Sequence, residues 1–145
     1  MRIAVIADTH DKYPPTLPER LRAADEIWHL GDVCAPETLA EFELLGVPLT
    51  VVLGNNDEHP WPLTRDLVRG GCRFHLVHIP PRRAPAGAEF VLHGHTHVPR
   101  DETDPAGVRW LNPGCITRPN RGAPASWAWL ILEQGAAPRW TTVAL

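Results

Sequence analysis

The sequence has little of several features that define other classes of protein. It has three cysteines among 145 residues, Cys34, Cys72 and Cys115, which are far apart and form no Cys-x-x-Cys pair. This pattern argues against a disulfide framework or a thiolate zinc site and is typical of the cytoplasm. No run approaches the roughly 18 apolar residues of a membrane span, and residues 1–8 resemble a strand rather than a signal peptide. We therefore expect a cytoplasmic protein without a membrane partner.

An excess of positive charge is also missing. Lysine and arginine total 14 against 17 aspartates and glutamates, so the net charge is −3 and nucleic acid is a disfavoured partner. The hydrophobic share of 43% and the charged share of 21% are ordinary for a globular protein. The sixteen prolines gather in short loops rather than in a linker. We predict a single domain over residues 1–145, long enough to bury a real core.

The first third of the chain alternates predicted strands and helices. Three short apolar runs predict strands at 2–7, 25–30 and 48–53. Two helices are predicted between them, one from a capping box at 16–19 to about residue 24, and one over 36–45 that ends at Gly46. This order predicts parallel strands joined by right-handed crossovers.

The rest of the chain is rich in predicted strands. They cover residues 73–77, 89–93, 107–111, 126–133 and 139–145. Trp127 and Trp129 are two residues apart, so we expect both on one face of a strand and in the core. An α/β beginning followed by a β-rich end predicts two packed sheets with helices outside them.

Residues of the types that bind metals come directly after five of the predicted strands. These are Asp8 and His10, then Asp32, Asn55 and His78, and finally His95 with His97. Because the carboxyl ends of neighbouring strands open on one crevice, we expect the seven side chains to converge there. Carboxylate, imidazole and amide ligands without thiolate suit Mn²⁺, Fe²⁺, Zn²⁺ or Mg²⁺, and a pair of such ions can clamp a phosphoryl group. The pattern predicts a centre of two metal ions.

Within this set, some roles stay open. Asp32 is the best candidate for a carboxylate that bridges two ions, because it alone supplies a carboxylate after its strand. Each ligand taken singly could be a polar turn residue, and His78 could be a half-buried strand histidine. His29 and His93 each end an apolar run before a ligand turn, which favours buried supporting histidines over ligands.

The set of motifs resembles the calcineurin-like metallophosphoesterases, and the small YfcE-like branch most of all. The motifs are Asp8-x-His10, Gly31-Asp32, Gly54-Asn55-Asn56-Asp57, His78, Gly94-His95-Thr96-His97 and Asn112-Pro113-Gly114, in order from residue 3 to about residue 118. The resemblance implies an α/β (α+β) fold, a four-layer αββα sandwich of two mixed sheets flanked by helices. It also implies two ions, with Mn²⁺ first and Fe²⁺, Zn²⁺, Ni²⁺ or Mg²⁺ as alternatives. Asp8, His10 and His97 would hold one ion, and Asn55, His78 and His95 the other. Asp32 would bridge them, and a metal-bridging hydroxide would attack phosphorus in line.

The sequence departs from the superfamily in two places. Many members carry a histidine where this chain has Asn56, and an amide can bind phosphate oxygen but cannot deliver a proton. Asn56 and Asp57 are therefore our candidate catalytic residues for a phosphodiester or an activated ester, although Asp57 could instead fix the turn. The residues between His78 and His95 are proline-rich and few, so a loop is expected there in place of an outer helix.

These features predict a metal-dependent phosphoesterase, first of all a phosphodiesterase, with a small phosphate ester as substrate. A phosphomonoesterase or a nucleotide pyrophosphohydrolase would use the same site. A non-catalytic scaffold that has kept the metal site is the alternative from another class, and the seven filled ligand positions argue against it. Homo-oligomers are compatible with the sequence, which shows no interface.

Overall fold

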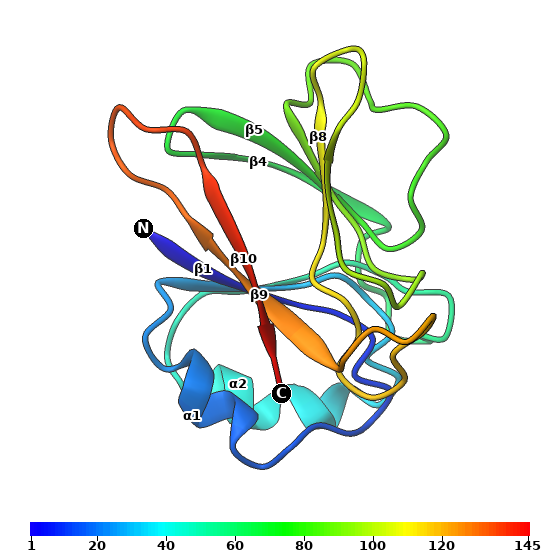
Figure 1. Cartoon of the computed structure of the whole chain (residues 1–145). Coiled ribbons are helices and arrows are strands. Elements are labelled where there is room, and N and C mark those ends of the chain that lie inside the picture. The colour runs from blue at the N-terminus through cyan, green and yellow to red at the C-terminus, as the bar shows by residue number, and fades with distance from the viewer.

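The computed structural model describes residues 1–145 and contains two five-stranded β-sheets packed against each other (Figure 1). The first sheet has the order β10-β9-β1-β2-β3, and the second has the order β4-β5-β6-β8-β7. The first sheet comprises β1 (Arg2–Ile6), β2 (Glu26–His29), β3 (Leu49–Val51), β9 (Ser126–Ile131) and β10 (Arg139–Ala144). The second comprises β4 (Thr64–Arg69), β5 (Cys72–Val77), β6 (Phe90–Leu92), β7 (Arg100–Thr103) and β8 (Arg109–Asn112).

Both sheets are mixed. In the first sheet β1, β2 and β3 are parallel, as the strand–helix–strand pattern predicts, and β9 and β10 run antiparallel to their neighbours. In the second sheet β5, β6 and β8 are parallel, and the edge strands β4 and β7 are antiparallel. The predicted fold class, an α/β sandwich of two mixed sheets, is confirmed. The carboxyl ends of three parallel strands in each sheet are available to build a site.

Strand β1 is buried on both faces, which explains its continuous apolar run. Ile3 and Val5 point into the core between the two sheets, whereas Ala4 and Ile6 face the helices. Trp127 lies in the helix-side core and meets Trp129 edge to face at 4.8 Å, as the two-residue spacing predicts; Trp127 is fully buried and Trp129 is half-buried.

The helices α1 (Leu17–Leu21) and α2 (Ala40–Glu43) cover the outer face of the first sheet, together with the 3₁₀ helix η1 (Pro36–Leu39) (Figure 1). Two expectations were wrong here. The Thr16 side chain makes no capping hydrogen bond, because its backbone is already helical (φ −81°, ψ −11°) and a capping residue needs an extended backbone. The helix also stops at Leu21, short of residue 24. None of the helices has the length or hydrophobicity to span a bilayer.

A loop takes the place of a helix on the outer face of the second sheet. Ala84 and Ala88, from the segment after β5, pack against Val77, Val91 and Trp110 of that sheet. The clipped connection between His78 and His95 is thus confirmed, and the sandwich has its helical layer on one side. The loop leaves the carboxyl end of β5 uncovered by a helix, which bears on access to the site.

Candidate metal centre

The turns that follow β1, β2, β3, β5 and β6 meet at one edge of the sandwich. The Asp8 amide donates to the Gly31 carbonyl at 3.0 Å, and the Gly94 amide donates to the His78 carbonyl at 3.1 Å. A Cβ atom on Gly54 would collide with the backbone of Asp32. Only glycine permits so close an approach. The seven predicted ligands are therefore brought to one crevice.

The backbone of this edge is strained at the predicted ligands. Five of them lie in the left-handed region, with φ values of 56° at Asp8, 45° at His10, 58° at Asp32, 67° at His95 and 59° at His97. For residues other than glycine this conformation costs on the order of 1 kcal/mol each. Such strain persists where the surrounding structure fixes it, and it concentrates at functional sites. The sequence motifs do not predict this left-handed backbone.

Asp8, Asp32 and His78 form the buried half of the crevice, with side chains exposed by 3% or less. His78 Nδ1 donates to the Leu30 carbonyl at 2.7 Å, so a neutral ring presents an unprotonated Nε2 to the site. That Nε2 lies 3.4 Å from Asp32 Oδ1 and 4.0 Å from Asp8 Oδ1. A lone pair facing two carboxylates needs a cation between them, either a proton or a metal ion.

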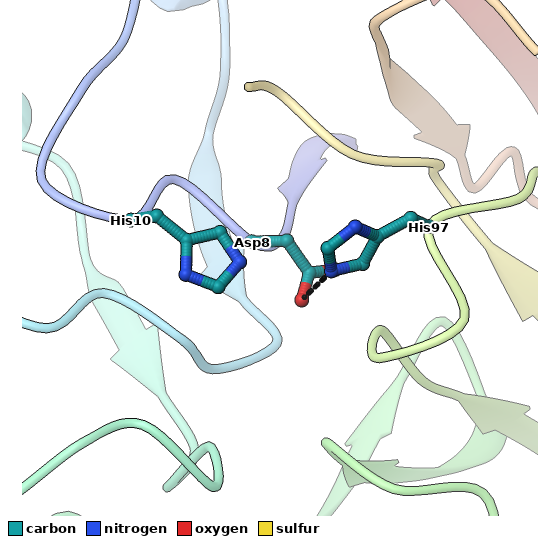
Figure 2. A group of neighbouring side chains, drawn as sticks. All are labelled: Asp8, His10 and His97. Carbon is teal, nitrogen blue, oxygen red and sulfur yellow. Dashed lines mark ion pairs between the residues drawn. The ribbon is translucent and has the colours of Figure 1, made fainter. Parts of the chain in front are cut away.

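The same arrangement recurs at His97 (Figure 2). His97 Nδ1 donates to the Arg118 carbonyl at 2.6 Å, and Nε2 lies 3.3 Å from Asp8 Oδ1. His10 Nε2 lies 3.7 Å from Asp32 Oδ2. Both His10 Nε2 and Asp8 Oδ1 are buried without any hydrogen-bond partner. Buried polar atoms are rarely left unpaired, and these two point into a group whose ligand atoms lie within 4.8 Å of one another. The residues present fit a divalent metal ion.

Asn55 and His95 complete the outer half of the crevice. Asn55 Oδ1 lies 3.0 Å from His78 Nε2 and 2.9 Å from His95 Nδ1, so three potential ligand atoms converge on one point. Asn55 and His95 are exposed, in contrast to the carboxylates behind them. This second convergence matches the group expected around the second ion.

Asp32 lies between the two groups. Its Oδ2 faces His10 and its Oδ1 faces His78. The Asn56 backbone amide donates to Oδ1 at 2.9 Å and the Asn56 side-chain amide donates to Oδ2 at 2.6 Å, which fixes the carboxylate in this orientation. Asp8 is also shared, since it belongs to both compact groups, one with His10 and His97 and one with Asp32 and His78.

Asp57 holds the turns together rather than facing the crevice. Its carboxylate accepts the backbone N–H groups of Asp32 (3.0 Å), Gly54 (2.8 Å) and Cys34 (2.7 Å). Both oxygens are thereby occupied. Of the two roles considered for Asp57, the structure places it in the turn-fixing one. The other candidate catalytic residue, Asn56, is exposed beside Asp32.

His29 joins two ligand-bearing turns. Its Nδ1 accepts the Gly31 amide at 3.2 Å, so its Nε2 carries the hydrogen and donates to the Thr9 hydroxyl at 3.0 Å. Thr9 lies between Asp8 and His10, and Gly31 precedes Asp32. Burial lowers the pKa of His29 to about 3, which keeps the ring neutral. The sequence indicated a supporting histidine here. It gave no signal for the supporting carbonyls of Leu30 and Arg118, because every residue has one.

Charge inside the crevice is unevenly compensated, poorly at Asp8 and well at Asp32. Burial raises the pKa of Asp8 to about 6, although His78 and His97 oppose the shift. Burial also works against the ionisation of Asp32, but hydrogen bonds from His78 and Asn56 outweigh it and hold the pKa of Asp32 well below its usual range. For His78, burial lowers the pKa, yet Asp32 and Asp8 raise it more. Two buried carboxylates thus draw positive charge into the crevice.

Comparison with known proteins identifies the family. A profile of the calcineurin-like phosphoesterase superfamily domain matches residues 1–135. The chain belongs to this superfamily. Its fold is similar to that of YfcE, a phosphoesterase from E. coli (24% identity, TM-score 0.77, 90% of this chain and 88% of that one). It is also similar to an archaeal phosphodiesterase (21%, 0.75, 99% and 100%) and to zinc-bound Vps29 from Entamoeba histolytica (21%, 0.78, 99% and 98%). A search of curated proteins finds no match.

Proposed function

We propose that the protein is a metal-dependent phosphodiesterase with a dinuclear centre. The observation that carries the proposal is the set of imidazole nitrogens at His78, His97 and His10 that lie 3.4, 3.3 and 3.7 Å from carboxylate oxygens of Asp8 and Asp32. Asp8, His10 and His97 would hold one ion, and Asn55, His78 and His95 the other. Asp32, with one oxygen toward each group, would bridge them. Mn²⁺ is the first candidate among ions that accept oxygen and nitrogen ligands.

When bound, two divalent ions would neutralise charge on a phosphate ester and lower the pKa of a water molecule toward neutrality. The protein's own residues fix the geometry. His78 and His97 are held by backbone carbonyls, and Asp32 is held by Asn56. Such outer hydrogen bonds orient ligands and make them better donors. The exposed side of the crevice, at Asn55 and His95, is where a substrate phosphate would enter.

The residues beside the centre favour diesters and activated esters. The Asn56 amide can donate a hydrogen bond to a phosphate oxygen but has no proton to transfer. Asp57 is occupied by three backbone amides. His59, the nearest histidine in sequence, packs on the Trp61 ring at 4.5 Å. A leaving group that needs a proton would therefore leave slowly. With three free cysteines, we further propose that the protein works on a small phosphate ester in the cytoplasm.

Hydrolysis of bis(p-nitrophenyl) phosphate with added Mn²⁺ tests the proposal, together with metal analysis of the purified protein. We expect turnover with two ions per chain, and its loss in Asp32→Asn, where the bridging charge is removed but the shape is kept. Two bound ions without turnover of this diester would contradict the phosphodiesterase proposal. Activity that persists in Asp32→Asn would contradict the bridging role.

A further inference from the structure

A polar hollow of about 460 Å³ opens beside the exposed end of the metal centre. Its lining includes His95, Thr96, His93, Arg100, Asn120 and Arg121. His95 belongs both to the hollow and to the proposed centre, so an organic group on a phosphate held at the centre would extend into the hollow. The volume lies in the range of sites that enclose small organic ligands, and it exceeds the space that a phosphate alone would fill.

The wall of the hollow is fixed to the metal-ligand turn. The Asn120 amide donates to the His97 carbonyl at 3.1 Å, and its side chain donates to the Thr96 carbonyl at 3.4 Å. The Arg118 carbonyl accepts the hydrogen of His97 Nδ1. These three bonds set the position of the neighbouring Arg121 relative to the site. The segment that bears Arg121 is therefore hydrogen-bonded directly to the turn that carries His95 and His97.

Arg121 is the uncompensated charge in this hollow. Arg100 is paired with Glu102 at 2.9 Å and lies over the Trp110 ring at 5.0 Å, so its positive charge is compensated within the protein. Arg121 is exposed and forms no ion pair. With two arginines and one glutamate, the lining carries one net positive charge, in a chain whose net charge is −3. Guanidinium groups pair well with phosphate and carboxylate oxygens.

The lining offers hydrogen bonds rather than stacking surfaces. No phenylalanine, tyrosine or tryptophan contributes to it, whereas binding of a nucleobase usually relies on such a face. The Thr96 hydroxyl accepts the Asn112 side-chain amide and keeps its own hydrogen for a ligand hydroxyl. The Asn120 side-chain amide has a second hydrogen besides the one it donates to the Thr96 carbonyl. The chemistry of the hollow thus favours a hydroxylated group over a base.

We propose that the hollow receives an organic substituent of the substrate phosphate and that Arg121 selects a hydroxylated substituent with a negative charge, such as a sugar phosphate or a hydroxy acid. This inference rests on the proposed function, because the phosphate at the centre anchors the substituent. Choline-like cationic substituents are disfavoured by the same charge.

Calorimetric titration of the Mn²⁺-loaded protein with three phosphate monoesters tests the inference. The ligands 3-phosphoglycerate, glycerol 3-phosphate and phosphocholine share the phosphate and differ in the charge at the other end. We expect affinity to fall in that order, by about twofold to fivefold for each step of exposed charge. The order should flatten in Arg121→Gln and reverse in Arg121→Glu. It should be kept in Arg22→Gln, which removes an exposed arginine on the helical side, paired with Glu19.

The outcomes separate this inference from the proposed function. Equal affinities in the unaltered protein, or an order that survives in Arg121→Glu, would overturn the role of Arg121 whether or not the diester is hydrolysed. The expected order, with its reversal in Arg121→Glu, supports the inference even if bis(p-nitrophenyl) phosphate is not turned over, a result that counts against the phosphodiesterase proposal alone.

Discussion

The two halves of the candidate metal centre differ in burial. Ligands in the two halves should therefore contribute alike to metal binding but differently to the stability of the metal-free protein. Asp8, Asp32 and His78 are enclosed, whereas Asn55 and His95 are exposed. An enclosed carboxylate costs free energy until a cation joins it. An exposed ligand is hydrated in the metal-free protein and carries little such cost. Within the buried half, Asp8 with its raised pKa therefore opposes folding without metal, whereas hydrogen bonds compensate the charge of Asp32. The outer half is nearly neutral in this respect.

Replacing Asp8 by asparagine should have the largest effect on both turnover and the stability of the metal-free protein. We expect turnover of bis(p-nitrophenyl) phosphate to fall by at least about a hundredfold, since even partners of metal ligands contribute up to that factor. The metal-free protein should nevertheless become more stable above pH 6, by about 1–3 kcal/mol, because burial raises the pKa of Asp8 from 3.8 to about 6. Urea unfolding at pH 7.5 with a chelator measures the gain.

His95→Ala provides the matched control from the outer half. It should lower turnover as a ligand loss does, but leave the stability of the metal-free protein within about 0.5 kcal/mol, as is usual for exposed positions. If Asp8→Asn destabilised the metal-free protein as well, the buried Asp8 carboxylate would not be under electrostatic strain, and the contrast between it and the outer half would be wrong.

Metal addition should stabilise the folded protein by compensating the buried Asp8 carboxylate. A ligand that binds the folded state alone stabilises it, by about 2.7 kcal/mol at a hundredfold excess over its dissociation constant. We expect Mn²⁺ to raise the melting temperature of the unaltered protein and to have far less effect on Asp8→Asn. A chelator should reverse the rise. Thermal scans at several Mn²⁺ concentrations provide the measurement, and equal shifts in both proteins would exclude Asp8 as a ligand.

Much of this centre could be predicted from the sequence because its ligands follow the strands that build it. The order of ligand turns along the chain is enough to place seven side chains at one edge once parallel strands are inferred. The left-handed backbone at Asp8 or His95 could not be predicted, because aspartate and histidine adopt it more often than most residues but still only in a small minority of cases. The role of Asp57 was left open, since its partners are backbone amides that no motif records.

The hydrophobic pattern of the sequence did not predict β4 and β7, and one physical cause explains both omissions. β4 and β7 are the two edges of the second sheet, and both carry charged residues at exposed positions, such as Arg65 and Asp101. Charged side chains on edge strands discourage pairing with other chains. They also erase the apolar pattern by which a strand is recognised. Prediction from hydrophobic pattern therefore finds the interior strands and misses edges protected in this way.

The buried His29 should make the free energy of unfolding depend on pH. The folded protein keeps the ring neutral, with a pKa near 3, whereas the unfolded chain binds a proton below about 6.5. Between these values the unfolded state holds more protons, so the free energy of unfolding falls as the pH is lowered. At pH 4.5 the loss from this group amounts to about 2–3 kcal/mol. Urea unfolding of metal-free His29→Gln should show a smaller loss between pH 7 and 4.5; equal losses would refute the assignment.

The smallest expected effect concerns the open side of the centre, at Asn56. If slow departure of basic alcohols reflects the lack of a proton donor, Asn56→His should raise turnover of an unactivated phosphomonoester by about tenfold or more, since general acids contribute at least that much. The same change removes the amide that holds Asp32, which works against the gain. Asn56→Ala loses that bond without supplying an acid, so the ratio of the two variants isolates proton transfer. A ratio near one would show that the leaving group departs without help from this position, and that the preference for diesters must arise elsewhere on the exposed side.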